Sequence, residues 1–232
     1  MTEWGATDVG VSVSRWRITE NQFFMTGEFN ASGLIQLIAD FSGHVNIKAI
    51  RDDESWQGQQ LVIASNWGSK TSVSETTWLH DGRIATTKTD PAPDLEEVHP
   101  IDAAMLRGVT DPFSAMMAML NRLDSGKSCS GVFQIYDGRR RAELSFSDLG
   151  IVELDPDRTF AFDGKTQLCG MVSLPLGGHR RKSRFTSRTP DPSKTRAYIA
   201  RLANGLLVPV RIEVDLFFGQ IVTRLDMKRS VF

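Results

Sequence analysis

The sequence predicts an all-β protein, mainly antiparallel, with one helix packed on the sheet. Short runs in which apolar and polar residues alternate recur along most of the chain, as they do in sandwiches and barrels. Asp-Gly or Asn-Gly pairs separate several of these runs, and we expect type I′ hairpin turns there. These pairs are Asp81-Gly82, Asp137-Gly138, Asp163-Gly164 and Asn204-Gly205. A long helical pattern occurs in residues 111–124.

The helix has clear signals at both ends. Asp111 is a good N-cap, Pro112 suits the first helical position, and Gly126 suits a left-handed C-cap. A helix of about 13 residues is marginal alone, so its apolar stripe must be buried, and a sheet is the available partner. The stripe consists of Phe113, Met116, Met117, Leu120 and Leu123.

Most strands follow from alternation of apolar and polar residues. Val9, Val11 and Val13 begin the first of them. We expect strands at residues 9–18, 23–29, 45–49, 61–67, 73–79 and 83–89, and after the helix at 131–136, 139–146, 151–154, 160–162, 168–174, 195–203, 206–216 and 221–227. Residues 33–41 instead fit a short amphipathic helix or helical turn, either a core-packing turn, which we favour, or a lid or membrane-touching element.

The segment at about 90–100 is rich in proline and acidic residues. Pro91, Pro93 and Pro100 exclude it from a sheet interior, so it is a connector. Each half of the chain has too few strands to bury its own core, and we expect residues 1–232 to form a single barrel-like domain.

Composition excludes several function classes. The 232 residues have a net charge of −1, with 41% hydrophobic and 24% charged residues, which is ordinary for a globular protein and argues against nucleic-acid binding. No apolar run is long enough to span a membrane. The four histidines, His44, His80, His99 and His179, are scattered, and no zinc, nucleotide or hydrolase motif is present. We therefore predict no catalytic residue, no metal and no cofactor.

A few side chains are candidates for ligand binding. Trp67 and Trp78 could line a cavity, although such tryptophans more often pack in a core. Met116, Met117 and Leu120 present flexible apolar surface on the helix. Alternation places Arg140 on the same face as Ala142, Leu144 and Phe146, either snorkelling at the strand end or paired with a buried acid.

A basic run follows the strand at 168–174. It could grip an anionic headgroup or a partner protein, or it could be a solvated edge strand kept soluble by charge. Its members are His179, Arg180, Arg181, Lys182 and Arg184.

The two cysteines, Cys129 and Cys169, lie at or near the start of predicted strands. Neighbouring strands could align them, but pairing needs an oxidising compartment. The residues alone leave a disulfide and two buried thiols as open alternatives.

Several motifs together resemble a family of uncharacterised envelope proteins of Gram-negative bacteria, a domain of unknown function whose members usually carry an export signal. The order and spacing of the motifs cover nearly the whole chain. They are Gly33-Leu34 with Asp40-Phe41, the Asp-Pro-x-Ser helix start Asp111–Ser114, the hairpin Tyr136–Arg140, the strand and basic run Cys169–Lys182, and Val208–Val214 with Phe218-Gly219.

The resemblance implies a periplasmic protein with a strongly curved open or spiral β-barrel, like that of lipoprotein carriers, and the helix at about 111–124 against its concave face. It also implies a Cys129–Cys169 disulfide. Residues 1–4 have neither the basic start nor the apolar stretch of a secretory signal, so the localisation rests on the resemblance.

We expect a non-enzymatic protein that maintains the envelope and binds a lipid or another hydrophobic molecule in the cleft of its barrel. A second hypothesis is a solidly packed scaffold that docks another envelope protein. The third is an envelope hydrolase, which would need at least two titratable side chains converging in a cleft. A hollow or filled interior distinguishes the first two hypotheses.

Overall fold

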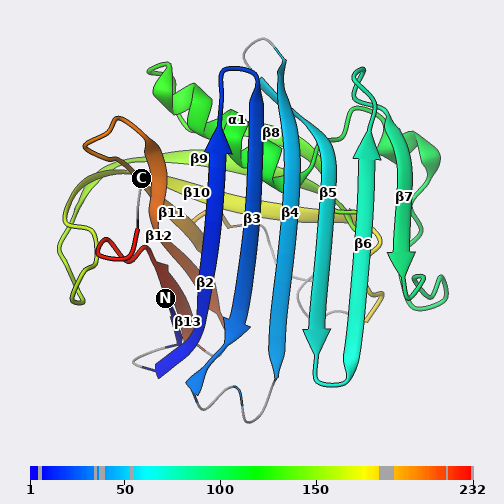
Figure 1. Ribbon diagram of the computed structural model, residues 1–232, viewed down its shortest axis with the longest axis horizontal. Coiled ribbons are helices and arrows are strands. Elements are labelled where there is room, and N and C mark those ends of the chain that lie inside the picture. The colour runs from blue at the N-terminus through cyan, green and yellow to red at the C-terminus, as the bar shows by residue number, and fades with distance from the viewer. Residues whose placement is uncertain are drawn as a thin grey trace.

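The computed structural model describes residues 1–4, 7–33, 36, 40–52, 55–182, 191–217 and 219–230 (Figure 1). One helix, α1 (Pro112–Asp124), and a short 3-10 helix, η2 (Ala103–Leu106), accompany the strands. The strands are β1 (Thr2–Trp4), β2 (Thr7–Ile18), β3 (Gln22–Ala31), β4 (Phe41–Asp52), β5 (Ser55–Trp67), β6 (Lys70–Trp78), β7 (Ile84–Asp90), β8 (Gly131–Tyr136), β9 (Arg141–Leu154), β10 (Gly164–Gly177), β11 (Thr195–Arg201), β12 (Leu207–Leu216) and β13 (Gly219–Arg224).

The described strands form one antiparallel sheet in the order β7-β6-β5-β4-β3-β2-β1-β13-β12-β11-β10-β9-β8. The sheet is strongly curved, so β8–β10 pass behind β2–β7, and α1 lies between the two layers (Figure 1). Within the described residues β7 and β8 remain the free ends of the strand order, so the barrel is open. The prediction of a curved, open antiparallel sheet with one helix on its concave face is confirmed.

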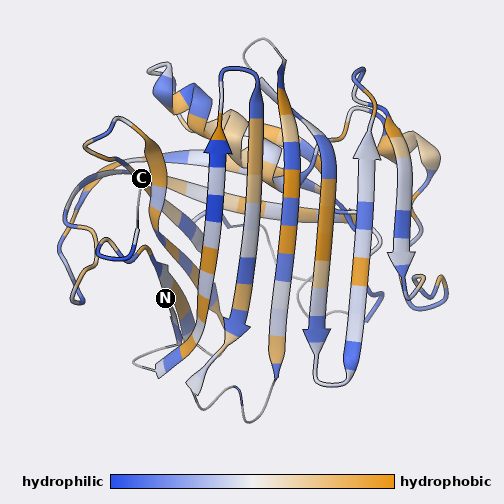
Figure 2. Cartoon of the chain, viewed as in Figure 1, coloured by the Kyte–Doolittle hydropathy of each residue, from blue (hydrophilic) through white to orange (hydrophobic). Residues whose placement is uncertain are grey.

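The core lies between the two layers and includes the helix. Apolar and polar residues alternate along the strands of the first layer (Figure 2), which gives each strand one face for the core. The main core cluster includes Phe23 and Met25 of β3 and Met119 and Leu120 of α1. Phe146 of β9 and Ile199 of β11 belong to the same cluster.

A buried N-cap attaches the helix to the first layer. The Asp111 carboxylate accepts hydrogen bonds from the backbone N–H groups of Phe113 and Ser114, both at 2.9 Å, and from the Ser114 hydroxyl. The predicted cap and the proline at the first position are both confirmed. Gly58 of β5 lies directly against this carboxylate, where any Cβ atom would collide with Oδ2.

The cysteines form a disulfide, as the resemblance implied. Cys129 and Cys169 are fully buried in the main core, with their Cα atoms 6.2 Å apart. The bond links the segment after α1 to β10 in the second layer. The helix is thus held to one layer by its cap and tied to the other by a covalent bond.

The hairpin turns at Asp81-Gly82, Asp137-Gly138 and Asn204-Gly205 are confirmed, but their predicted type I′ geometry is wrong. Asp163-Gly164 forms no hairpin turn, because Gly164 is the first residue of β10 after the 155–163 connection. In each turn the glycine has positive φ, whereas the preceding Asp or Asn does not. The side chains of Asp81, Asp137 and Asn204 instead accept a hydrogen bond from the backbone N–H two residues later, at 2.8 to 3.1 Å. This is the Asx-turn alternative open to short polar side chains.

The strand predictions at 139–146, 151–154 and 160–162 need correction. Residues 160–162 form no strand: Phe160 has a φ of 66° in a turn, and its carbonyl accepts from the Met227 N–H. The strands predicted at 139–146 and 151–154 are one strand, β9, which begins at Arg141 because Arg139 and Arg140 belong to the hairpin turn. The helical element expected at 33–41 falls largely on residues outside the described part of the chain.

We expect Gly58→Ala to lower the free energy of unfolding by about 1–3 kcal/mol, because the new methyl group displaces the capped end of α1. Gly43→Ala is the matched control, since a Cβ there meets no atom closer than 3.8 Å. Urea unfolding followed by tryptophan fluorescence measures both. Equal stability of the two variants would contradict the proposed close contact.

Candidate ligand-binding cavity

A cavity of about 460 Å³ lies on the concave face of the first layer. Strands β2–β5 form its floor, the first two turns of α1 form one wall, and β12 forms another. The wall residues are largely apolar: Trp16, Phe23, Met25, Phe29, Phe41, Val45, Ile63, Phe113, Met116, Met117, Pro209 and Ile212. The volume falls in the range of small-molecule sites.

Small residues on adjacent strands make the space. Ser14 pairs with Gly27, and Gly27 pairs with Val45. Next to this row, Ser12 and Gly43 flank Phe29. A Cβ on Gly27 would clash with Val45 at 2.8 Å, whereas one on Gly43 would have room. At Ser12, Ser14, Gly27 and Gly43 the inward side chain is small or absent, which leaves space above the sheet.

The inward face of β2 reverses the usual pattern. The side chains of Ser12 and Ser14 line the cavity, and by alternation those of Val11 and Val13 lie on the opposite face, so the cavity meets Val13 at its backbone. The Val13 side chain is 46% exposed. A strand whose apolar side faces solvent leaves the interior underfilled at that point. The cavity follows from this reversal.

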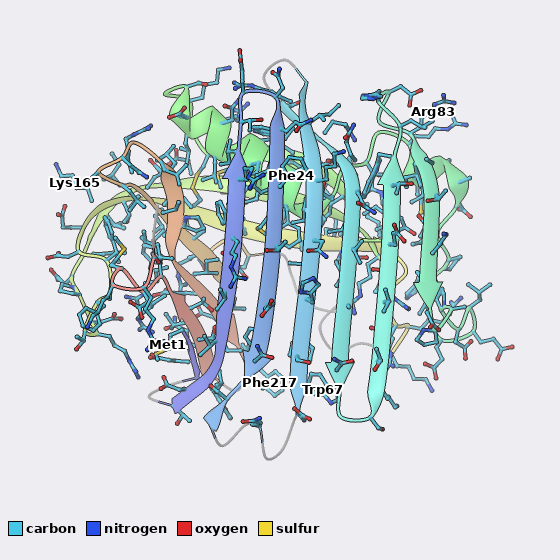
Figure 3. The ribbon with its side chains drawn as sticks, in the orientation of Figure 1. Met1, Phe24, Trp67, Arg83, Lys165 and Phe217 are labelled. Atoms are coloured by element: carbon cyan, nitrogen blue, oxygen red, sulfur yellow. A yellow bond between two sulfur atoms is a disulfide. The ribbon has the colours of Figure 1, made fainter. Side chains whose placement is uncertain are left out.

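Aromatic rings border the cavity at both ends. Trp16 meets Phe23 edge to face, with ring centroids 6.2 Å apart. At the other end Phe41 lies between Phe29 and Trp67, at 5.5 and 5.4 Å. Phe23 is fully buried, whereas Trp67 is 61% exposed at the end of β5 (Figure 3). The aromatic border therefore passes from the core out to solvent.

The cavity presents little acid–base chemistry. Its titratable lining residues are Glu28 and His44, which pair with each other across β3 and β4. By alternation from Phe29 and Gly43, both side chains lie on the convex face, so the cavity meets their backbone. Among the described residues no group of three or more metal-ligating side chains comes together. No helix in the described part of the chain is long and apolar enough to cross a membrane.

Asp111 is the buried acid beside the cavity. It caps the helix that carries Phe113, Met116 and Met117, and its side chain is fully buried. Burial raises the pKa of this carboxyl above 3.8, and the hydrogen bonds from Ser114 and Phe113 oppose that rise. The carboxylate positions the cavity wall through the helix and is not itself a lining residue.

The predicted ligand-binding residues divide into three groups. Met116 and Met117 line the cavity. Trp78 and Leu120 are buried in the core outside it, and Trp67 contacts its border through Phe41. Ligand binding by each of these residues stays a prediction.

Arg140 does not point inward, so the placement by alternation is wrong. It is exposed in the hairpin turn before β9 begins, so strand alternation does not apply to it. The buried arginine is Arg141, whose guanidinium donates to the carbonyl oxygens of Met105 and Ile135. Arg139 ties the turn to the first layer by donating to the carbonyls of Val73 and Pro91.

The basic run lies apart from the cavity but near Arg140. Burial, followed by the nearby His99 and Arg140, lowers the pKa of His179, whose ring lies 4.4 Å from that of His99. Arg180, Arg181 and Lys182 are exposed, and Arg184 lies outside the described residues. Binding of an anionic group by this run stays a prediction.

Sequence reasoning missed the floor of the cavity. Ser12, Ser14, Gly27 and Gly43 carry no chemistry that identifies a site, and their alignment depends on strand register. The available signal was Gly27 inside one predicted strand and Gly43 just before the next, since glycine within a strand often marks a place where a ligand or another backbone approaches closely.

A family model described as "Protein of unknown function (DUF3108)" matches residues 1–226. No curated protein matches the chain. Among solved structures, the crystal structure of a DUF1089 family protein from Pseudomonas aeruginosa is 11% identical, with 85% of this chain and 87% of that chain covered and a TM-score of 0.39. A likeness at this level supports no argument about fold or function.

The raised pKa of Asp111 predicts a pH dependence. The folded state favours the protonated carboxyl, so this group stabilises the fold most below pH 3.8, and that contribution is lost as pH rises through the raised pKa. Asn caps a helix as well as Asp does and carries no charge. We therefore expect Asp111→Asn to gain stability relative to the natural protein from acidic to neutral pH, as measured by urea unfolding. A difference that stays constant with pH would contradict the burial argument.

Proposed function

Because the chain belongs to the DUF3108 family, whose function is unknown, we propose a function from the cavity: the protein is a non-enzymatic carrier that holds a lipid or another hydrophobic molecule. The observation that carries the proposal is the largely apolar cavity of about 460 Å³ between the sheet and α1. A solidly packed scaffold would need this space filled. A hydrolase would need titratable side chains converging in it.

The shape of the cavity favours a linear ligand. Along β3 the lining runs from Phe23 to Phe29, a span of about 20 Å at roughly 3.3 Å per residue. A modest volume spread over this length fits a single hydrocarbon chain better than a compact ring system. Flexible Met116 and Met117 can adapt to such a chain.

We further propose that the protein works in the periplasm of a Gram-negative bacterium, in maintenance of the cell envelope. The buried Cys129–Cys169 disulfide supports an oxidising compartment. The resemblance of the motifs to exported envelope proteins supports the same location.

Filling the cavity tests carriage. In Gly43→Leu the new side chain projects from the floor into the space, so we expect binding of a fluorescent fatty acid to weaken at least about tenfold. The fold should remain intact, because a Cβ at this position meets no close neighbour. Asn46→Leu is the matched control on the convex face of β4 and should bind normally.

Two results would remove the proposal. The first is equal affinity of the two variants in the fluorescence titration. The second is natural protein that carries no lipid in native mass spectrometry after purification from envelope extract and gains no thermal stability from added fatty acid.

A further inference from the structure

The edge of β2 is only partly covered. β1 pairs with the beginning of β2, where Trp4 lies opposite Thr7 and Thr2 opposite Gly10. From Ser12 to Ile18, β2 pairs with β3 on one side, and no described strand pairs with it on the other.

The hydrogen-bonding direction of each β2 residue follows from two bonds at the ends of the β2–β3 pair. The Thr19 N–H donates to the Gln22 carbonyl at 2.8 Å, and the Ser32 N–H donates to the Val9 carbonyl at 3.1 Å. In an antiparallel pair the direction alternates, so odd-numbered residues of β2 bond to β3. The backbone groups of the even-numbered residues from Ser12 to Ile18 therefore point outward, ready for another strand.

This edge lacks the protection found at the other two ends of the sheet. Proline follows β7 directly, and β8 is covered in part by a parallel bridge between Thr110 and Ile135. Along β2 every side chain from Val11 to Ile18 is exposed, and no proline or bulge interrupts the run. Exposed strand edges of this kind bind extended peptides by strand addition.

The side chains define the partner. Arg15 and Arg17 project from the convex face, opposite Thr26 and Phe24 of β3. Both are exposed, and neither forms an ion pair with another described residue. On the concave face, Ser14 and Trp16 border the apolar cavity. A strand that complements this edge therefore carries acidic side chains on its convex face, beside the arginines, and apolar side chains on its concave face, beside the cavity.

We propose that the edge of β2 from Ser12 to Ile18 receives an extended segment of a partner protein as an added β-strand. Glutamate or aspartate of that segment lies beside Arg15 and Arg17, and its alternate apolar side chains lie over the cavity. The inference rests on strand pairing and charge, and it holds whether or not the cavity carries a lipid.

A soluble peptide of alternating valine and glutamate is the probe, and its valine–lysine counterpart is the comparison. We expect the glutamate peptide to bind at least about tenfold more tightly in fluorescence anisotropy. It should slow amide exchange at Ser12, Ser14 and Trp16, as observed by NMR. Binding that is absent, or equal for both peptides, overturns the proposal.

Two variants separate backbone pairing from charge. Ser14→Pro removes an outward N–H while the bonds to β3 remain, so peptide binding should be lost, whereas Ser14→Ala should retain it. Arg15→Glu should reverse the peptide preference, and Lys48→Glu, on the same face but two strands away, should not. Retained binding in Ser14→Pro, or an equal effect of the two charge reversals, overturns the proposal. A third outcome is a natural protein that binds no peptide but forms a dimer that Ser14→Pro dissociates. This result would assign the edge to a second copy of the chain and would also overturn the proposal.

Discussion

The close contact between the Asp111 carboxylate and Gly58 determines where the helix lies in this fold. A curved antiparallel sheet has more concave surface than its own side chains can cover, so it needs an internal partner. A helix of 13 residues supplies that partner only if its free N–H groups are satisfied in the core. Asp111 satisfies two of them, and the absence of a side chain on Gly58 lets the cap approach β5. Burial of the Asp111 carboxyl group raises its pKa because the charged form loses its hydration, which is the cost of placing a polar cap inside a core.

The cavity is the part of the interior that the helix, held in this position, does not fill. The helix fills the interior near Leu61 and Trp78, where inward side chains are large and buried. On the neighbouring strands β2, β3 and β4 the inward positions include Ser14, Gly27 and Gly43, and the space between sheet and helix is left open there. Filled core and cavity are therefore two stretches of one surface, and the size of the inward side chain distinguishes them.

Much of the fold could be predicted because its signals are local. The cap, proline and apolar stripe of residues 111–124 identified the helix with its correct ends, and most strands followed from alternation. Alternation failed where a neighbouring segment changes the environment: Arg140 belongs to a turn, and Phe160 lies in a turn whose carbonyl accepts from Met227. The valines of β2 look like a core face, yet Ser12 and Ser14 face inward because of pairing with Phe29 and Gly27. Such a site depends on register between strands, which a single sequence does not contain.

The strand β1 has a consequence for how the chain reaches this structure. Its three residues join β2 to β13, and the Thr2 hydroxyl lies 3.0 Å from that of Thr223, a separation of 221 positions along the chain. The Glu3 carboxylate stabilises this junction through ion pairs with the guanidinium groups of Arg158 and Arg224, with N–O distances of 2.6 and 2.7 Å. Contacts this distant in sequence carry a large loop-closure entropy and form late. During synthesis the two sheet halves can each begin to assemble, but they become continuous only after β13 has left the ribosome.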